Sequence, residues 1–206
     1  MELLTVKKDI SVEITEKKSV FIGHSFFVTS EEESMEKINN IKNKYSDATH
    51  NVWAYSLRKY SAQKCSDDGE PQGTAGLPIL SVIKNNEIVD TAIVVTRYFG
   101  GILLGAGGLI RAYSKAAALA IETAGKTPIL LMTSFSLEYN YDMNKTIQHT
   151  LTKFSAQNIE IVFLEKVTTT AMLPADIFRE FEEAIKQLYY KDLEIKILNE
   201  EYQRKT

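Results

Sequence analysis

The most informative stretch of the chain lies near its middle and is rich in glycine and basic residues: VVTRYFGGILLGAGGLIRAYSK, from Val94 to Lys115. It begins inside the β-branched run Thr91 to Tyr98, which is typical of a buried strand. The glycines that follow predict a turn, and the alanine-rich stretch from Leu109 to Ala124 predicts a helix with an apolar inner face. The segment is therefore expected to fold as strand, glycine turn and helix.

This segment has the chemistry of an anion site. Arg97 is expected where the strand ends, and Arg111 and Lys115, four residues apart, share one face of the helix. Backbone N–H groups that converge just before a helix, together with the helix dipole, favour negative charge. The predicted anion- or RNA-binding surface consists of Arg97, Gly100, Gly101, Gly105, Gly107, Gly108, Arg111 and Lys115.

The alternative interpretation is structural. The glycines would then only allow the helix to pack closely on the sheet, and the basic residues would pair with carboxylates elsewhere. A loop with three such carboxylates, Asp67, Asp68 and Glu70, lies in the segment SDDGEPQGTAG, from Ser66 to Gly76.

The acidic loop itself has two interpretations. With His50 it suggests a site for a hard cation, which takes several carboxylate oxygens. However, Asp-Gly and Glu-Pro are turn formers, Asp side chains bond their own backbone, and Thr74 is suited to cap a following helix. The sequence favours the turn, so we expect neither a metal nor a cofactor.

The sequence lacks residues that the known nucleotide-binding and catalytic motifs require. Gly105 is followed by Ala106, where a Walker A loop would need lysine, and Ile110 stands where a dinucleotide motif needs its third glycine. The single cysteine, Cys65, has no supporting nucleophile signature beside His50. We assign no catalytic residue, and an enzyme is disfavoured.

Aromatic and basic residues are interleaved in the first half, a mixture that suits stacking on single-stranded RNA. Burial of the aromatic rings in the core is the competing interpretation. The residues concerned are Trp53, Tyr55, Tyr60, Tyr98 and Tyr113, with Arg58, Lys59, Lys64, Arg97 and Arg111.

Charge and composition narrow the class of protein. The 206 residues carry a formal net charge of −3, with 15 basic against 15 acidic residues in 1–128 and 9 against 12 in 129–206. Neither half attracts a polyanion over its whole surface, so any nucleic-acid contact must come from a local patch. A lone cysteine, a charged N-terminus and the lack of an apolar run of roughly 20 residues predict a cytoplasmic protein with no membrane contact.

Two domains are expected, 1–127 and 128–206. Eight of the ten glycines lie between Gly69 and Gly108 and none follows Gly125, and the segment from Gly125 to Pro128 has the composition of a linker. The front half is expected to hold strands over 9–15, 20–29, 52–57 and 91–98, with helices over 31–45, 77–83 and 109–124.

The back half predicts a simpler alternation of elements. Strands are expected over 129–139, 159–164, 167–173 and 193–198, with helices over 142–156 and 176–189. The order β-α-β-β-α-β is that of a ferredoxin-like domain. The whole chain is therefore assigned to the α+β class.

Four motifs resemble those of the IMPACT family. They are KSVF (Lys18–Phe21), ATHNVWAY (Ala48–Tyr55), the element DDGEPQGTAGLP (Asp67–Pro78), and the run VVTRYFGG with its continuation to Tyr113. The resemblance implies a first domain similar to the β-α sandwich of a ribosomal-protein domain shared with elongation factor G and GHMP kinases. It implies a tail like that of bacterial YigZ-like members, similar to elongation factor G domains, and a role in translation and its regulation.

The sequence thus predicts a non-enzymatic, translation-related regulatory protein that binds RNA, the ribosome or translation factors. The alternative is an enzyme that handles phosphate esters or nucleotides, in which the glycine turn cradles a phosphate and the acidic loop holds a cation. An open basic face favours the first function, and a deep pocket joining Asp68, Glu70 and the glycine turn favours the second.

Overall fold

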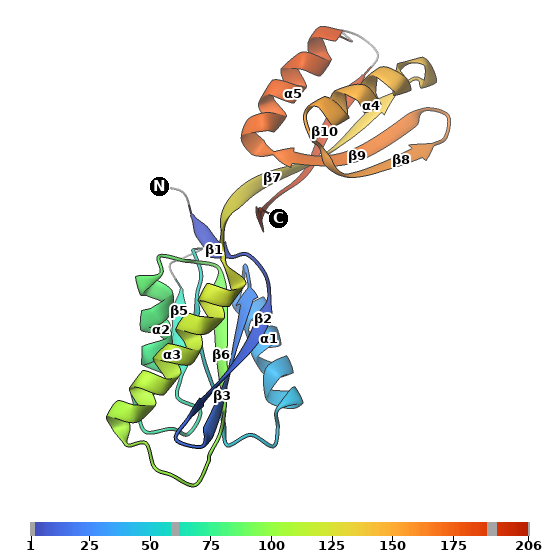
Figure 1. The fold of residues 1–206 in the computed structure, drawn as a ribbon. Helices are drawn as coiled ribbons and strands as arrows, with labels where there is room; N and C mark the ends of the chain where they lie inside the picture. The colour runs from blue at the N-terminus through green and yellow to red at the C-terminus, as the bar shows by residue number, and fades with distance from the viewer. Residues whose placement is uncertain (1–2, 59–61, 189–192, 206) are drawn as a thin grey trace. The chain divides into compact units, whose positions relative to one another are not determined.

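The computed structural model describes residues 3–58, 62–188 and 193–205. The chain divides into two compact units (Figure 1). The first unit is Met1–Ile129 with Arg204–Thr206, and the second is Leu130–Gln203. Each unit has its own hydrophobic core.

The first unit is built on a five-stranded sheet with the order β2-β3-β6-β4-β5. Neighbouring strands in this order are antiparallel. The strands are β2 (Ile10–Glu16), β3 (Ser19–Phe27), β4 (His50–Ser56), β5 (Gln63–Ser66) and β6 (Thr91–Tyr98). Because β6 lies at the centre of the sheet, between β3 and β4, it is buried on both faces, as its β-branched sequence predicts.

Helices cover both faces of this sheet. Helices α2 (Gly76–Asn85) and α3 (Ala106–Ala124) pack on one face, and α1 (Glu31–Lys44) packs on the other (Figure 1). The side chains of β6 alternate between the two cores: Ile93 and Val95 face α2 and α3, whereas Ala92 and Val94 face α1. Ser30 caps α1 by accepting a hydrogen bond from the Glu33 N–H.

The second unit has the ferredoxin-like order predicted from the sequence. Strand β9 lies between β7 and β8, and β10 pairs with the other side of β7. Helices α4 and α5 pack on one face of the sheet around Phe135, Leu137 and Phe181. The elements are β7 (Lys126–Tyr139), the 3-10 helix η2 (Tyr141–Met143), α4 (Asn144–Lys153), β8 (Gln157–Phe163), β9 (Val167–Pro174), α5 (Ala175–Leu188) and β10 (Glu194–Arg204). The predicted end of the second helix, at Tyr189, lies outside the described residues.

The segment from Gly125 to Pro128 is not a free linker. Gly125 ends α3 with a φ of 70°, as expected of glycine after a helix, but β7 begins at the next residue. Its first three residues pair with a short strand that the sequence does not predict, β1 (Leu4–Val6). From the other side, the N–H of Lys205 donates to the Pro128 carbonyl. None of the described helices is both long and apolar enough to cross a bilayer.

Candidate functional site

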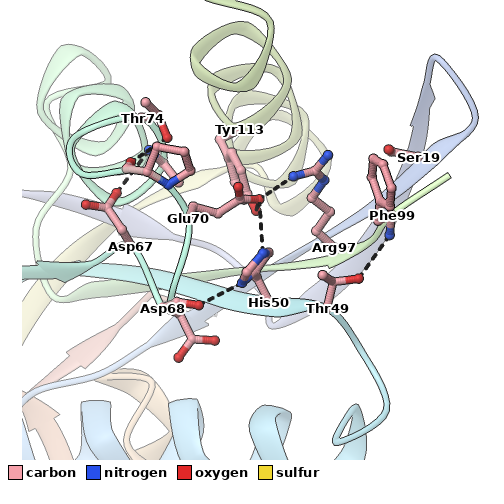
Figure 2. Close-up of polar contacts among 12 residues, drawn as sticks. Ser19, Thr49, His50, Asp67, Asp68, Glu70, Thr74, Arg97, Phe99 and Tyr113 are labelled. Atoms are coloured by element: carbon pink, nitrogen blue, oxygen red, sulfur yellow. Dashed lines mark hydrogen bonds and ion pairs between the residues drawn. The ribbon is translucent and has the colours of Figure 1, made fainter. Parts of the chain in front are cut away.

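A buried carboxylate organises one end of the first unit. Glu70, 7% exposed, accepts hydrogen bonds at the same oxygen, Oε1, from Arg97 Nη1 and from the Tyr113 hydroxyl, both at 2.6 Å. These three side chains come from the loop before α2, from β6 and from α3 (Figure 2). Burial, together with the hydrogen bond to the negative Glu70, raises the pKa of Tyr113 far above its ordinary value. The tyrosine therefore stays protonated and donates to the carboxylate.

Arg97 lies inside this network and not on the surface where the sequence analysis placed it. It is 5% exposed, and its guanidinium lies between two rings, 5.4 Å from Phe21 and 5.5 Å from Phe99. Its strand is central in the sheet, so its side chain points into protein, and a buried guanidinium needs a carboxylate partner. For this residue the pairing interpretation is right, and Glu70 is the partner.

Asp67 binds the start of α2. Its carboxylate accepts the N–H groups of Gly73, Ala75 and Gly76 at 2.8, 3.1 and 2.8 Å. Burial opposes ionisation of this group, but the three backbone donors outweigh burial and lower the pKa of Asp67 below its ordinary value. The predicted cap, Thr74, instead donates to the Pro71 carbonyl, so Asp67 takes the capping role.

Asp68 is also bonded to the protein. One carboxylate oxygen lies 2.6 Å from Lys42 Nζ, and the other accepts the Asn51 N–H at 2.7 Å. Its carbonyl accepts the Nδ1–H of His50 at 2.8 Å, and the opposite ring nitrogen of His50 lies 3.9 Å from Glu70 Oε1 (Figure 2). Within the described ranges, no three His, Cys, Asp or Glu side chains are grouped as metal ligands would be.

The glycine turn connects β6 to α3. Gly100 lies so close to the backbone of Lys18 and Ser19 that a Cβ there would overlap them, and its N–H donates to Ser19 Oγ at 3.1 Å. Gly105, with a φ of 69°, is the N-cap of α3, which begins three residues earlier than predicted. Gly107 and Gly108 lie in the first turn of this helix, and Gly101 lies in the exposed loop before it.

A small pocket of about 190 Å³ opens where α3 begins. Arg111 and Lys115 line one side, and Lys17, from the turn between β2 and β3, lines the pocket with them. Glu16, Leu104, Gly108 and Ala112 complete the lining. Among the residues that the structure describes, Lys17, Arg111 and Lys115 form no ion pair within 4.0 Å. We call this group of three side chains the basic pocket.

The structure therefore brings together only part of the predicted site. Arg111, Lys115 and Gly108 meet in the basic pocket, whereas Arg97 and the acidic loop form the buried network. Sequence reasoning missed Lys17, although it precedes the KSVF motif directly. Pairing of Glu16 with Ser19 leaves Lys17 and Lys18 as the two central residues of a hairpin turn, with φ of 44° and 68°.

Most of the aromatic residues expected to stack on RNA belong to the core. Tyr55 and Tyr113 are buried, Trp53 stacks on Tyr55, and Tyr98 donates to Asp47. Tyr60 and Lys59 lie outside the described residues. The aromatic side chain that is exposed beside the glycine turn is Phe99, at 45%.

Two further basic residues of that predicted surface, Arg58 and Lys64, are engaged with carboxylates. Arg58 pairs with Asp90, and Lys64 pairs with Glu31. Cys65 is part of β5 and lies opposite Ala54, while His50 bonds to Asp68. Burial raises the pKa of the Cys65 thiol, which keeps it protonated.

The fold and the buried network define an α+β protein built on an Impact N-terminal domain, whose family model matches residues 17–121. The IMPACT family member YvyE of Bacillus subtilis is 43% identical over 164 residues, which is 79% of this chain and 76% of the relative. The IMPACT family member YigZ of Escherichia coli is 30% identical over 190 residues, 89% of this chain and 92% of the relative. The chain belongs to the IMPACT family, a family linked to the regulation of translation, and is YigZ-like.

Two further comparisons cover different shares of this chain. The protein IMPACT homolog of Dictyostelium discoideum is 39% identical over 97 residues, covering 45% of this chain but 28% of that protein. A crystal structure of a hypothetical protein matches 98% of this chain and 100% of its own, with a TM-score of 0.65 and 28% identity. The similarity to the solved structure thus spans both units.

Proposed function

We propose that this chain is a non-enzymatic, translation-related binding protein that binds phosphate groups of RNA, free or in the ribosome, at the basic pocket. The observation that carries the proposal is the set of three cations, Lys17, Arg111 and Lys115, around one opening without ion-pair partners among the described residues. Like charges gathered in a concave site focus the field on an anion. The proposal includes a cytoplasmic location, where such RNA is found.

The start of α3 adds to this field. The first N–H groups of a helix have no acceptor within the helix, and the N-cap, Gly105, has no side chain to supply one. The glycines at 105 and 107 are exposed, so a phosphate oxygen has access to the backbone there. One carboxylate, Glu16, lies in the lining and limits the excess to about two positive charges.

Binding is favoured over turnover because the acidic loop is already used by the protein. Asp67, Asp68 and Glu70 bond to backbone N–H groups, Lys42, Arg97 and Tyr113, and they do not line the basic pocket. An enzyme that acts on phosphate esters would need a bound metal ion or a general base beside the phosphate. Reproducible turnover of a phosphorylated substrate that is lost in Asp68→Asn would support the enzyme instead.

The test is the salt dependence of RNA binding. Three neutralised phosphates predict a slope of log K against log [salt] of roughly −2 for single-stranded RNA, because each contributes about −0.7. Replacing Lys17, Arg111 or Lys115 by alanine should flatten the slope by about 0.7 and weaken binding, measured by fluorescence anisotropy of a labelled oligoribonucleotide. Lys145→Ala, an exposed lysine of the second unit, and Cys65→Ala are the matched controls.

Two outcomes would reject the proposal. Binding that does not respond to salt would exclude an electrostatic patch. Binding that all three alanine variants retain would move the contact away from the basic pocket. Amide NMR shifts at Gly105 to Arg111 on addition of inorganic phosphate locate the site independently.

A further inference from the structure

Strand β8 is an apolar edge of the second unit's sheet. It is the last strand in the order, and no described strand pairs with its outer side. All seven of its residues are exposed, although Ile159, Ile161, Val162 and Phe163 are large and apolar. Unpaired N–H and C=O groups along an apolar edge are a template for pairing with another strand.

The opposite edge of the same sheet is protected in the usual way. Strand β10 carries five charged side chains in its eleven residues: Glu194, Lys196, Glu200, Glu201 and Arg204. Strand β8 carries one, Glu160, in seven. Charges on an edge strand discourage pairing, and β8 has almost none of this protection. The contrast between the two edges singles out β8 as the pairing edge.

The core of the second unit continues onto this edge. Ile161 lies opposite Thr169 and Phe163 opposite Val167, and both β9 residues are completely buried. Residues that lie directly opposite each other on neighbouring strands have their side chains on the same face of the sheet. Ile161 and Phe163 therefore lie on the face that α4 and α5 cover, which we call the covered face. The Phe163 ring is also stacked on Tyr141, whose hydroxyl donates to the Leu164 carbonyl. A strand added beyond β8 would bury these apolar groups.

We propose that two copies of this chain pair through β8, antiparallel about a two-fold axis perpendicular to the sheet, with Ile161 opposite Ile161 of the second copy. Such an axis keeps the covered faces of both sheets on the same side. In this register Phe163 lies opposite Ile159 of the second copy, an aromatic pair with a β-branched residue.

The position of Glu160, the one charged residue of β8, favours this register and a second copy of the chain as the partner. Centring the pair on Ile161 places Glu160 opposite Val162, so no two carboxylates meet. Centring it on Glu160 would place two carboxylates face to face, and centring it on Val162 would place Ile159 opposite Glu165. The alternation around Ile161 is therefore self-complementary, which is what an isologous contact requires. The bulge between Gln157 and Glu160 contains Ile159, so the regular part of the contact runs from Glu160 to Val162 around Ile161, and the pairs of Phe163 with Ile159 lie at its two ends.

Association of the full chain tests the proposal. Light scattering and sedimentation over a range of concentrations should show a dimer. Ile161→Lys brings two ammonium groups together at the axis and should weaken association by about thirtyfold or more. Because Ile161 is exposed in the single chain, this variant should fold, as checked by circular dichroism. The matched control is Ile197→Lys, an exposed isoleucine on β10 that should leave the dimer unchanged.

The register has its own test. In a Cys65→Ala background, Ile161→Cys should form a disulfide-linked dimer on mild oxidation, because residues directly opposite across antiparallel strands suit a disulfide. Leu198→Cys, on β10, should not. A chain that stays monomeric and does not cross-link overturns the proposal and leaves a strand of another protein as the occupant of β8. A dimer that Ile161→Lys leaves intact also overturns it.

Discussion

The side chain of Arg97 is fixed by Glu70: Nη1 of the guanidinium donates to Oε1 of the carboxylate across 2.6 Å, and both side chains are almost wholly buried. Glu70→Gln keeps the shape of the side chain but leaves a cation without its counter-charge. Removing one member of a buried ion pair costs about 3 to 5 kcal/mol, so we expect a loss of that order in the free energy of unfolding, measured in urea. Because the loss comes from the unpaired buried cation, adding Arg97→Lys to Glu70→Gln keeps a cation there and should not restore the stability of the unaltered protein.

The matched control for this prediction is the exposed pair of Lys64 and Glu31. Glu31→Gln should change the free energy of unfolding by less than about 1 kcal/mol. If Glu70→Gln proved as stable as the unaltered protein, water would have to reach Arg97, and the network would be an open site instead of a structural one.

The buried histidine of β3 makes stability depend on pH. His24 is completely buried between Ser11 and Thr96, and burial, assisted by the positive charge of Lys44, lowers the pKa of His24 from 6.5 to about 4. The contribution of the neutral ring is present above pH 6.5 and is lost as the pH falls toward 4, because the unfolded chain then binds the proton more readily. The loss by pH 5 should be about 2 kcal/mol.

Urea unfolding at pH 7.5 and pH 5 measures this loss. His24→Gln should show a smaller loss between the two pH values than the unaltered chain, since an amide does not titrate. His149→Gln, which replaces an exposed histidine of the second unit, should behave like the unaltered chain. If the free energy of unfolding fell by the same amount between pH 7.5 and pH 5 in His24→Gln and in the unaltered chain, another group would cause the pH dependence.

Phe99 is expected to add stacking to the phosphate contact of the basic pocket. One face of its ring lies over Arg97, the ring is 45% exposed, and the next residue lies against Lys18, the neighbour of Lys17. Phe99→Ala should weaken binding of single-stranded RNA by about tenfold, because a base stacked on an aromatic ring contributes about 1 to 3 kcal/mol. Leu103→Ala, in the same exposed loop, is the control.

An abasic oligomer with the same ribose-phosphate backbone separates the two contributions. It should bind Phe99→Ala and the unaltered chain equally, since it keeps the phosphates and lacks the bases. If the abasic oligomer bound the unaltered chain as tightly as RNA does, Phe99 would have no stacking role, while the basic pocket would still hold the backbone.

The last residues of the chain stabilise the first unit. Lys205 donates to the Pro128 carbonyl and accepts a hydrogen bond from the Thr127 hydroxyl, and Arg204 pairs with Asp9. Ending the chain after Gln203 should cost the first unit about 1 to 2 kcal/mol, seen as faster amide exchange in the paired segment of β1 and β7. Arg204→Ala removes the ion pair with Asp9 and the contact of the guanidinium with the Phe27 ring but keeps the backbone hydrogen bonds of Lys205, and it should cost less. Equal exchange in the shortened and complete chains would contradict this role.

The regular elements were predictable where the local sequence determines them. The β-branched run Thr91–Tyr98 is a strand with the predicted bounds, and the alternation of the second half predicts the ferredoxin-like order. By contrast, β1 has three residues and pairs with the distant strand β7, and β5 has four residues and pairs with β4, the strand before it in the chain. Short strands of this kind carry too little local pattern to be predicted.

For the candidate site, the sequence indicates the residue types but not how they are grouped in space. The sequence places Arg97 and Arg111 in one segment, yet the strand turns Arg97 into protein while α3 presents Arg111 to solvent. Lys17 reaches the same pocket from a hairpin about ninety residues away in the chain. Such a grouping depends on which side of the sheet each element packs, and periodicity along the chain does not contain that information.

Gly100 sets how closely the turn between β2 and β3 can approach the loop that leads into α3. Because any β-carbon at this position would overlap the backbone of Lys18 and Ser19, every larger residue forces these two segments apart. Lys17 in the hairpin turn and Arg111 on α3 would then no longer line one pocket, and the proposed phosphate site would be lost. A distant sequence with alanine here and the same hairpin length would therefore have to place its cations differently, so this single position can sort candidate relatives before any binding experiment is done.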